Sequence, residues 1–358
     1  MINSKKTLVI LSPGFAANEA DSTCLPAQQQ LVKTLSEEFP SIQLIVLAFQ
    51  YPFSDQPYQW NGISVIPFNG RNKSKLYRLW VWLRVWKQLN ALKKKYTLIG
   101  LFSFWYGECA LIGKWFGKRN DIKHFTWLLG QDARKGNKYI RFLRPRAAEL
   151  VALSDMLATE YKKNYITVPA HVIPAGIDPG LYFKMPSVRD IDILGVGSLI
   201  PLKRYHLFIE TIIVLKKEFP GIKAVICGKG EEENKLRSLV AEAGLEDSIL
   251  LTGEKPHTEV LQLMQRSKLF LHPSAYEGFG VVCLEALYAG AHVLSFFCPQ
   301  DGWIRHWHIA EDMQSITDKA LELLRSADLD HSSVLPYTMK DTAHAIIELF
   351  DHNEMAAS

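Results

Sequence analysis

Two acidic residues, Glu277 and Glu285, enclose the glycine-rich stretch EGFGVVCLE, and side chains at this spacing could hold the hydroxyl groups of a polyol. The apolar run before the stretch predicts a strand and the run after it predicts a helix. Glu277 is therefore expected in the loop at the carboxyl end of a strand, and Glu285 one to two turns into the helix. Gly278 and Gly280, on either side of Phe279, let the backbone approach a ligand and expose amides that favour an anion. Carboxylates accept strongly from hydroxyls, so we expect Glu277 to hold a sugar and Glu285 a ribose.

A simpler alternative is that Glu277 caps the helix and that Glu285 is a solvated helix residue. The neighbours of Glu285 argue against this alternative because they are all apolar. They are Val281, Val282, Leu284, Ala286 and Leu287. An acid inside such a run needs a partner or a ligand, since burying an unpaired charge is costly.

A pair of cations, Lys203 and Arg204, stands in the loop of a second strand–loop–helix unit, GVGSLIPLKRYHLFIE. The strand ends at Gly197, and Ser198 follows it. The two cations are thus placed to meet phosphate, Lys203 as a point charge and Arg204 as a fork. They could bind a diphosphate and neutralise it as it departs. The alternative is a surface Lys–Arg pair, and the spacing from the acidic motif favours the binding interpretation.

The elements that position these motifs form two series of alternating strands and helices. The first half predicts strands at 7–11, 42–49, 63–68, 97–102, 124–128 and 150–153, and helices at 25–39 and 76–92. The Pro- and Gly-rich segment 171–183 ends this series. The second half predicts strands at 191–196, 223–227, 248–252, 269–272 and 292–296, and helices at 205–218, 231–243, 258–266, 280–289 and 311–325. This alternation is typical of parallel sheets covered by helices on both faces, whose ligands bind beyond the carboxyl ends of the strands.

The second half resembles the retaining glycosyltransferases of family four. The resemblance is carried by Glu277 and Glu285 at the family's spacing and by Lys203 in its motif. Supporting runs are AVICGKGEEENKLRSLVAEAGL, ILLTGEKPHTEVLQLMQRSKLFLHPSAYEGFG and VIPAGID. The resemblance is dense over 191–295 and looser over 7–178. It implies an α/β protein of the GT-B fold, in which two doubly wound Rossmann-like domains face a central cleft. The expected domains are an acceptor domain at 1–175, a nucleotide-sugar donor domain at 176–338, and a last helix within 339–358 that returns to the first domain.

The resemblance also implies roles for individual residues. Glu277 would lie against the donor sugar, Glu285 would hold the ribose and Lys203 the diphosphate. The backbone of Gly253, Glu254 and Lys255 would lie by the nucleobase, near a loop formed by Gly228, Lys229 and Gly230. One departure is Ser198, where the family often has Arg; either Arg204 supplies the missing charge or the diphosphate is held more weakly. A second departure is the aromatic-rich stretch CPQDGWIRHWHI, for which the sequence offers no account.

The first half contributes two candidate loops. Ser12–Phe15, which contains Gly14, occupies the family's first-strand loop and would approach the donor phosphates or the acceptor. Asp132, in the run WLLGQDARKGN, is a candidate to touch the acceptor or the transferring sugar. An Asp turn before a glycine-containing loop explains the same residue equally well. We expect His124 to be a structural strand residue rather than a base.

The basic segment 76–95, LYRLWVWLRVWKQLNALKKK, has two interpretations. A basic amphipathic helix with Trp can lie on an anionic membrane surface, which would suit a lipid-linked acceptor. Alternatively it is a core helix whose Lys and Arg stems extend along apolar surface. We favour the core helix, because apolar positions cover nearly all faces between Leu79 and Trp86.

Whole-chain properties limit the classes of function. A net charge of +4 over 358 residues is too weak to indicate nucleic acid, and no aromatic–basic stacking motif is evident. The five cysteines lack a paired motif, so we expect reduced thiols and a cytoplasmic protein; contact with the inner face of a membrane stays open. No metal or other cofactor is expected, because the cations and helix N-termini can neutralise the diphosphate.

The predicted reaction is therefore retaining transfer of a sugar from a nucleoside-diphosphate sugar to a saccharide or lipid-linked saccharide acceptor. Two alternatives stay open. One is another enzyme on the same fold, such as an epimerase or a phosphorylase. The other is a sugar-nucleotide binding module without catalysis. The nucleobase, the sugar, the acceptor and the linkage are not predicted.

Overall fold

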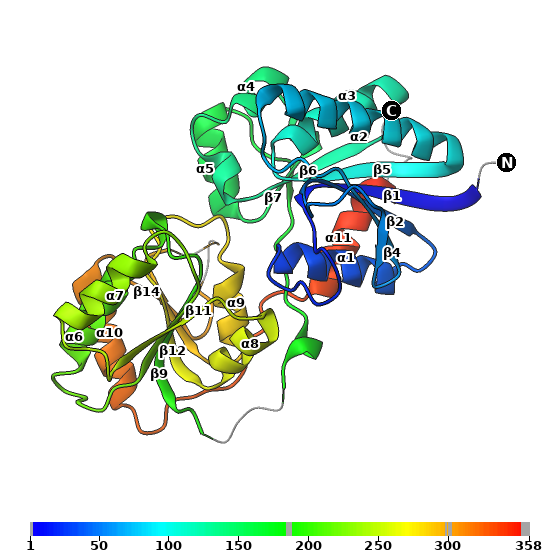
Figure 1. The fold of residues 1–358 in the computed structure, drawn as a ribbon. Coiled ribbons are helices and arrows are strands. Elements are labelled where there is room, and N and C mark those ends of the chain that lie inside the picture. The colour runs from blue at the N-terminus through cyan, green and yellow to red at the C-terminus, as the bar shows by residue number, and fades with distance from the viewer. Residues whose placement is uncertain (1–2, 184–187, 298, 300–302, 352–358) are drawn as a thin grey trace. The chain divides into compact units, whose positions relative to one another are not determined.

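The computed structural model describes residues 3–183, 188–297, 299 and 303–351 (Figure 1). The chain divides into two compact units, each with its own sheet. Unit 1 consists of Met1–Gly176 with Met339–Ser358, and unit 2 is Ile177–Thr338. From the sequence we place the boundaries after residues 175 and 338, the first of them one residue earlier than in the structure.

The sheet of unit 1 has eight strands in the order β3-β4-β2-β1-β5-β6-β7-β8. Their bounds are β1 Asn3–Gly14, β2 Gln43–Tyr51, β3 Tyr58–Trp60, β4 Ile63–Pro67, β5 Tyr96–Phe104, β6 His124–Leu128, β7 Leu150–Ala152 and β8 His171–Val172. All neighbouring strands are parallel except β3 and β4. The chemistry of a parallel sheet is therefore expected at the loops that follow β1 and β6.

Strand β3 corrects the expectation of a wholly parallel sheet. It pairs antiparallel with β4, so that Trp60 lies opposite Ile63. The two residues between them, Asn61 and Gly62, both have positive φ, at 46° and 74°. Two-residue hairpins with a type I′ turn require this backbone, and Asn-Gly is a strong sequence signal for them. The dipeptide thus predicts the hairpin that hydrophobic periodicity did not show.

Helices cover both faces of the unit 1 sheet (Figure 1). Helices α2 (Lys75–Lys95) and α3 (Glu108–Asn120) share one hydrophobic cluster with β1, β2 and β5. Helices α1 (Pro26–Glu38) and α11 (Met339–Asp351) contact each other, joined by the Lys340–Glu38 ion pair at 2.8 Å. The Phe350 ring of α11 lies 6.5 Å from Phe102 and 5.1 Å from Phe125. A Cβ added to Gly100 would come within 2.2 Å of this ring, so the strand is open at the point where α11 docks.

Helix α2 is only partly the core helix that we favoured. Its buried side is narrow and aliphatic, formed by Val81, Val85, Leu89 and Leu92. Four large apolar residues point outward instead. They are Leu76, Leu79, Trp80 and Leu83, with exposed fractions of 79, 50, 47 and 69%. The apolar residues surround the helix because it has two apolar sides, one of which the core does not cover.

Three helices of unit 1 are absent from the prediction: α3, the short α4 (Lys138–Leu143) and α5 (Asp155–Tyr165). In α3 the glycines hide the helical pattern. A Cβ at Gly113 would lie 2.4 Å from the His124 ring, and one at Gly117 would lie 2.6 Å from the Ile122 carbonyl. Close packing on the sheet therefore requires residues of poor helix propensity. The start of α5 could have been predicted from the sequence, because Ser is a preferred N-cap residue. The Ser154 side chain indeed accepts a hydrogen bond from Leu157 N at 3.0 Å.

The sheet of unit 2 has six parallel strands in the order β11-β10-β9-β12-β13-β14. Their bounds are β9 Ile191–Val196, β10 Ala224–Cys227, β11 Ile249–Gly253, β12 Ser267–His272, β13 His292–Ser295 and β14 Trp307–Ile309. Helices α6 (Tyr205–Leu215), α7 (Glu233–Glu242) and α10 (Met313–Arg325) share a hydrophobic cluster with the strands. Helices α8 (His257–Gln265) and α9 (Val281–Tyr288) contact each other and the strands β9, β12 and β13.

Strand β14 accounts for part of the unexplained stretch at 298–309. Trp307 is buried, and its indole N–H donates to Ser295 Oγ of β13 at 2.8 Å. The aromatic residue thus fixes the edge strand to the sheet. Cys298 and residues 300–302 lie outside the described residues. The other four cysteines are free thiols.

Candidate functional site

The carboxyl ends of three neighbouring strands of unit 2 are built from glycines. Gly197 after β9 and Gly228 after β10 both have φ of 151°, and Gly253 ends β11 with φ of 73°. Their backbones are hydrogen-bonded in a row, from Gly228 N to Gly253 O at 2.9 Å and from Gly197 N to Cys227 O at 3.0 Å. A Cβ at Gly228 would lie 1.9 Å from the Gly197 carbonyl. The strand ends can approach this closely only without side chains.

The loop after β9 is joined to the loop after β12. Ala275 N donates to the Leu202 carbonyl at 2.9 Å. Arg204 Nε and Nη2 donate to the carbonyls of Pro273 and Ser274, at 2.8 and 3.2 Å. The cationic motif and the acidic motif are therefore held against each other by their backbones.

Lys203 and Glu277 meet across this junction. The Lys203 ammonium forms an ion pair with Glu277 Oε1, and each side chain is less than a fifth exposed. Glu277 Oε1 also contacts His272 Nε2 at 2.8 Å. Both contacts go to the same oxygen, and within the described part of the chain no hydrogen bond reaches Oε2. One carboxylate oxygen is thus fixed while the other can accept a hydroxyl.

The charge state of Glu277 follows from these neighbours. Burial by itself would raise its pKa, but the His272 hydrogen bond and the Lys203 charge outweigh burial and hold the pKa at about 2. An ionised carboxylate only accepts hydrogen bonds, so His272 must carry its proton on Nε2. Burial lowers the pKa of His272, which leaves the imidazole neutral at pH 7.

Glu285 is held in the same way on helix α9. Its Oε1 contacts His257 Nε2, from the first turn of α8, at 2.7 Å. Burial opposes protonation of His257, yet the hydrogen bond and the charge of Glu285 raise its pKa overall. The Glu285 side chain is 14% exposed, which contradicts the solvated alternative. Glu277 is not the helix cap either, because Gly280 is the N-cap and no described side chain caps α9.

The charges of the predicted Lys203, Glu277 and Glu285 all act on one buried thiol, that of Cys283. Burial raises the pKa of Cys283 well above its usual value; the charge of Glu277 raises it further, Lys203 lowers it and Glu285 raises it. All three charges therefore lie close enough to Cys283 to interact with it through the protein interior. The structure brings together the set that the sequence motifs predicted.

The remaining cations of the motif loops are engaged within unit 2. The Arg204 guanidinium lies 4.7 Å from the centre of the Phe296 ring, in addition to its two carbonyl partners. This arrangement contradicts the surface-pair alternative and gives Arg204 the role of holding the loop after β12. Ser198 is exposed at the end of β9. In the loops after β10 and β11, Lys229 forms an ion pair with Glu254.

Lys255 stands beside a separate hollow on the same side of unit 2. Its ammonium lies 3.2 Å from Glu259. The hollow has a volume of about 590 Å³ and is lined by Thr252, Lys255 and residues of α8. In the acidic motif, Gly278 and Phe279 are buried, and the Phe279 ring lies 5.9 Å from Tyr337. Phe279 therefore packs inside the unit.

The candidates of unit 1 are less suited to contact a ligand. Asp132 is 3% exposed, and its Oδ2 accepts from Tyr106 N at 2.9 Å and Leu129 N at 3.0 Å. Burial raises its pKa to about 7 although these amides lower it. The geometry favours the Asp-turn interpretation. Gly14 ends β1, where its neighbour Phe15 N donates to Tyr51 O at 3.1 Å.

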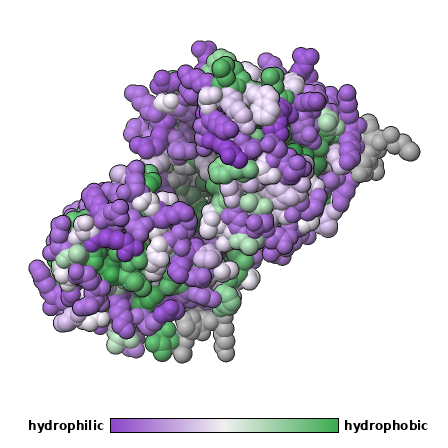
Figure 2. Space-filling model, in the orientation of Figure 1, coloured by the Kyte–Doolittle hydropathy of each residue, from purple (hydrophilic) through white to green (hydrophobic). Residues whose placement is uncertain are grey.

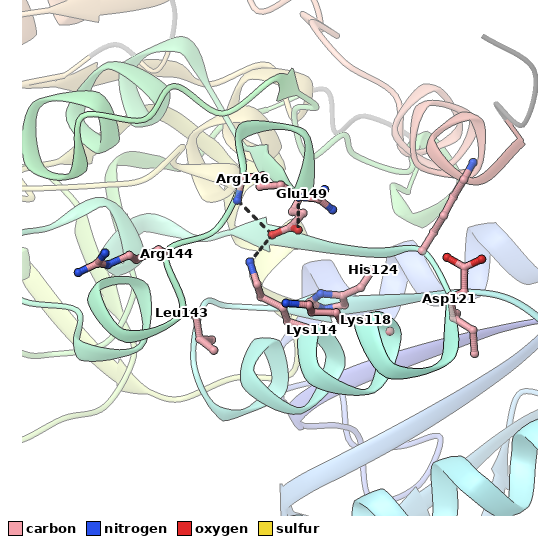
Figure 3. A pocket seen from close by; sticks show the side chains of 11 residues that line it. Lys114, Lys118, Asp121, His124, Leu143, Arg144, Arg146 and Glu149 are labelled. Atoms are coloured by element: carbon pink, nitrogen blue, oxygen red, sulfur yellow. Dashed lines mark hydrogen bonds and ion pairs between the residues drawn. The ribbon is translucent and has the colours of Figure 1, made fainter. Parts of the chain in front are cut away.

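His124 lines a pocket of about 800 Å³ in unit 1 (Figure 3). Its Nε2 contacts Ser103 Oγ at 2.8 Å, and burial lowers its pKa to about 3, as suits a structural strand residue. The pocket wall is basic. Lys114 lies 2.6 Å from Glu149, and Arg146 Nε donates to the same carboxylate at 2.8 Å (Figure 3). Lys118 and Arg144 also line it.

Sequence reasoning missed the two histidines that hold the acids. His272 is the last residue of β12 and His257 the first of α8, and neither stands at a spacing that marks a motif. Only the fold brings them to Glu277 and Glu285. Among the described residues, no group of three or more His, Cys, Asp or Glu is arranged to hold a metal ion.

Comparisons with known proteins agree with this geometry. The family described as glycosyl transferases group 1 matches residues 185–307. An uncharacterized glycosyltransferase of Haemophilus influenzae is 27% identical over 191 residues, which are 50% of this chain and 51% of the relative. The lipopolysaccharide core biosynthesis mannosyltransferase LpsB of Rhizobium meliloti is 29% identical over 180 residues, or 45 and 49% of the two chains. The chain thus matches about half the length of these curated relatives.

Solved structures are similar over nearly the whole chain. Anabaena HepE, solved in complex with UDP-glucose, has a TM-score of 0.69 and 17% identity, covering 96% of this chain and 95% of its own. The pneumococcal O-GlcNAc transferase GtfA, in complex with UDP and GlcNAc, has a TM-score of 0.62 and 14% identity, covering 96% of both chains. These similarities establish the GT-B fold.

Proposed function

We propose that this chain, whose residues 185–307 belong to the group 1 glycosyl transferases, transfers a sugar from a nucleoside-diphosphate sugar to a saccharide or lipid-linked saccharide, with retention of configuration. The observation that carries the proposal is the buried Lys203–Glu277 ion pair at the strand ends of unit 2, followed by Glu285 on helix α9 with its own histidine partner. A cation beside two acids that each keep one oxygen available matches a ligand with both phosphates and hydroxyls.

Each group has a distinct task in the proposed donor complex. Lys203 neutralises the diphosphate as it leaves, helped by amides at the N-terminus of α9. Glu277 Oε2 accepts from a hydroxyl of the sugar, and Glu285 from a hydroxyl of the ribose. His272 and His257 hold the opposite oxygens. Because these interactions neutralise the diphosphate, we propose that the reaction requires no metal.

The proposed transfer breaks the bond between the sugar C1 and the diphosphate oxygen and forms a bond from C1 to the acceptor oxygen on the same face. The acceptor's proton passes to the departing phosphate oxygen, so no side-chain base is required. A sugar nucleotide as donor is supported by the UDP-glucose bound to HepE, and sugar transfer by the mannosyltransferase among the relatives.

The first experiment is a thermal-shift screen with uridine, guanosine and adenosine diphosphates and their sugar nucleotides. A ligand at 100 times its Kd adds about 2.7 kcal/mol to the free energy of unfolding, which a melting curve resolves. The best donor is then incubated with a broad set of saccharide acceptors. We expect Glu277→Gln to bind nucleotide nearly as wild type does and to lose transfer, while Glu246→Gln, on an exposed surface, keeps both.

Three results would contradict the proposal. Nucleotide binding without transfer to any acceptor would indicate a binding module. A requirement for inorganic phosphate would indicate a phosphorylase, and conversion of the donor sugar without acceptor would indicate an epimerase.

A further inference from the structure

The helical layer of unit 1 formed by α2, α3 and α4 has an apolar stripe that the fold leaves uncovered. Leu76, Leu79, Trp80 and Leu83 follow the i, i+3, i+4, i+7 spacing of one helix face. This face is opposite the buried residues of α2, so the helix is apolar toward the core and again toward solvent. Figure 2 shows hydrophobic patches among hydrophilic surface over this part of unit 1.

A second pair of exposed aromatic residues belongs to the same layer. Trp115 of α3 is 44% exposed and Phe142 of α4 is 69% exposed, and their ring centres are 6.2 Å apart. Helix α3 contacts both α2 and α4. Apolar side chains are therefore exposed on all three helices, whereas isolated exposed apolar residues would need no explanation.

The charge of this layer is strongly one-sided. Residues 71–95 contain nine Lys or Arg and no Asp or Glu, and residues 134–146 contain six and again no acid. The rest of the chain holds 26 Lys or Arg against 37 Asp or Glu and is therefore acidic. The pocket of His124 is lined by Lys118 of α3 and by Arg144, which follows α4, and its two acids are Asp121 and Glu149.

Trp80 shows how apolar and cationic groups are combined. The Arg84 guanidinium lies 4.4 Å from the centre of the Trp80 ring. Arg84 is itself anchored, 2.7 Å from Asp55 and donating to the Phe68 carbonyl at 3.2 Å. A Trp ring beside an anchored cation is a pairing suited to the boundary between hydrocarbon and lipid headgroups.

We propose that this face of α2, with α3 and α4 beside it, docks on a bilayer surface that contains anionic phospholipid. The stripe enters the headgroup region and the flanking cations meet lipid phosphates. A second copy of the same face fits poorly, because two such basic surfaces would repel each other. The inference stands on this surface of unit 1 and does not depend on sugar transfer.

The test measures binding of the full chain to sedimented vesicles of phosphatidylcholine alone and of phosphatidylcholine mixed with phosphatidylglycerol. The stripe variant changes Leu76, Leu79 and Leu83 to Gln. The matched control changes three equally exposed apolar residues elsewhere, Ile166, Val188 and Leu250, to Gln. Melting curves of both variants verify that they fold, which the exposure of all six side chains predicts.

We expect wild type and control to bind the anionic vesicles, to release them on addition of salt, and to bind neutral vesicles weakly. The stripe variant should bind anionic vesicles roughly tenfold less tightly. Equal binding by the stripe variant and wild type would overturn the proposal, as would failure of wild type to bind. A wild-type dimer that the stripe substitutions dissociate in sedimentation would instead assign this face to a second copy.

Discussion

At the scale of residues, each acid of the candidate site is fixed by a histidine through one oxygen. His272 is 1% exposed at the end of β12 and holds Glu277, and His257 holds Glu285 from the start of α8. A neutral imidazole orients a carboxylate without cancelling its charge, so Glu277 keeps the negative charge that the Lys203 ammonium requires. We therefore regard His272 as a positioning residue.

Replacing His272 by Phe tests this positioning role. Without the hydrogen bond from His272, burial should raise the pKa of Glu277 from its value of about 2. The group is ionised only above its pKa, so the acid limb of the pH–kcat profile should move to higher pH. We expect kcat to fall roughly tenfold to a hundredfold at pH 7 through misplacement of the carboxylate. An unchanged acid limb in a variant that melts like wild type would show that His272 only fills space.

Asp132 offers a prediction that separates structure from catalysis. An amide oxygen can accept the two loop N–H groups as a carboxylate does, so Asp132→Asn should keep wild-type melting and most of the activity. Asp132→Ala leaves two buried N–H groups without an acceptor and should cost about 2–5 kcal/mol. Denaturation curves and transfer assays of both variants decide the point. Loss of transfer in a fully stable Asp132→Asn would restore the catalytic interpretation.

The site residues differ in how far sequence could predict them. Lys203, Glu277 and Glu285 stand at fixed spacings around glycines, and the structure brings all three together. His257 and His272 lack such a signal, because their partners come from other elements. Arg204 shows a third case. Its guanidinium predicted phosphate binding, yet two of its N–H groups donate to backbone carbonyls of the loop after β12.

At the scale of elements, the position of the site depends on strand ends that lack side chains. The backbones after β9, β10 and β11 are stacked in hydrogen-bonded register, and on the other side of β9 the bond from Ala275 N to Leu202 O holds the loop of Glu277 beside that of Lys203. Side chains there would separate the loops before any ligand could reach them.

Gly228→Ala should separate the loops in this way. The new Cβ would lie 1.9 Å from a backbone oxygen, at a φ of 151° that alanine avoids, so we expect a loss of about 3 kcal/mol or more. Gly221→Ala is the matched control, since nothing lies within 4 Å of its Cβ position. Urea denaturation and nucleotide binding measure both effects. Similar free energies of unfolding for Gly228→Ala and Gly221→Ala would contradict this prediction, because they would show that the strand ends can move apart to accommodate the added Cβ.

The elements themselves were predicted where hydrophobic periodicity is strong and missed where packing overrides it. The strands β1, β2, β5 and β9 were expected from continuous apolar runs. Helix α3 was not, because its glycines are required by the close approach of His124 and Ile122. Strand β14 has only three residues and is identified by the Trp307 hydrogen bond to β13 rather than by any pattern.

At the scale of the molecule, four histidines make the stability of unit 2 dependent on pH. The His292 ring lies 4.2 Å from His306, 5.4 Å from His308 and 5.8 Å from His331. The pKa values of His292 and His308 are lowered to about 4, chiefly by burial; neighbouring imidazoles add to this effect at both, and Lys319 adds to it at His308. Asp330 and Arg305 face the cluster and form an ion pair.

The sign of this dependence follows from the lowered values. Above pH 6.5 these histidines are neutral in both the folded and the unfolded chain, so stability is unaffected. As the pH falls from 6.5 toward 4, protons bind the unfolded chain first, and the melting temperature should fall by roughly 5 °C or more. His308→Gln should flatten the decline, whereas His206→Gln should not. If the melting temperatures of wild type, His308→Gln and His206→Gln fell equally with pH, the histidine cluster would be excluded as the cause.

The docking of Phe350 against Gly100 has a consequence for how the protein is made. Because α11 packs on the sheet of unit 1, the N-terminal half of the polypeptide leaves the ribosome before its fold can be completed and must wait until α11 is synthesised. Unit 2, although second in order, has all of its strands available earlier. We therefore expect unit 2 to fold first during synthesis, and unit 1 to complete its fold afterwards although most of its residues are synthesised first.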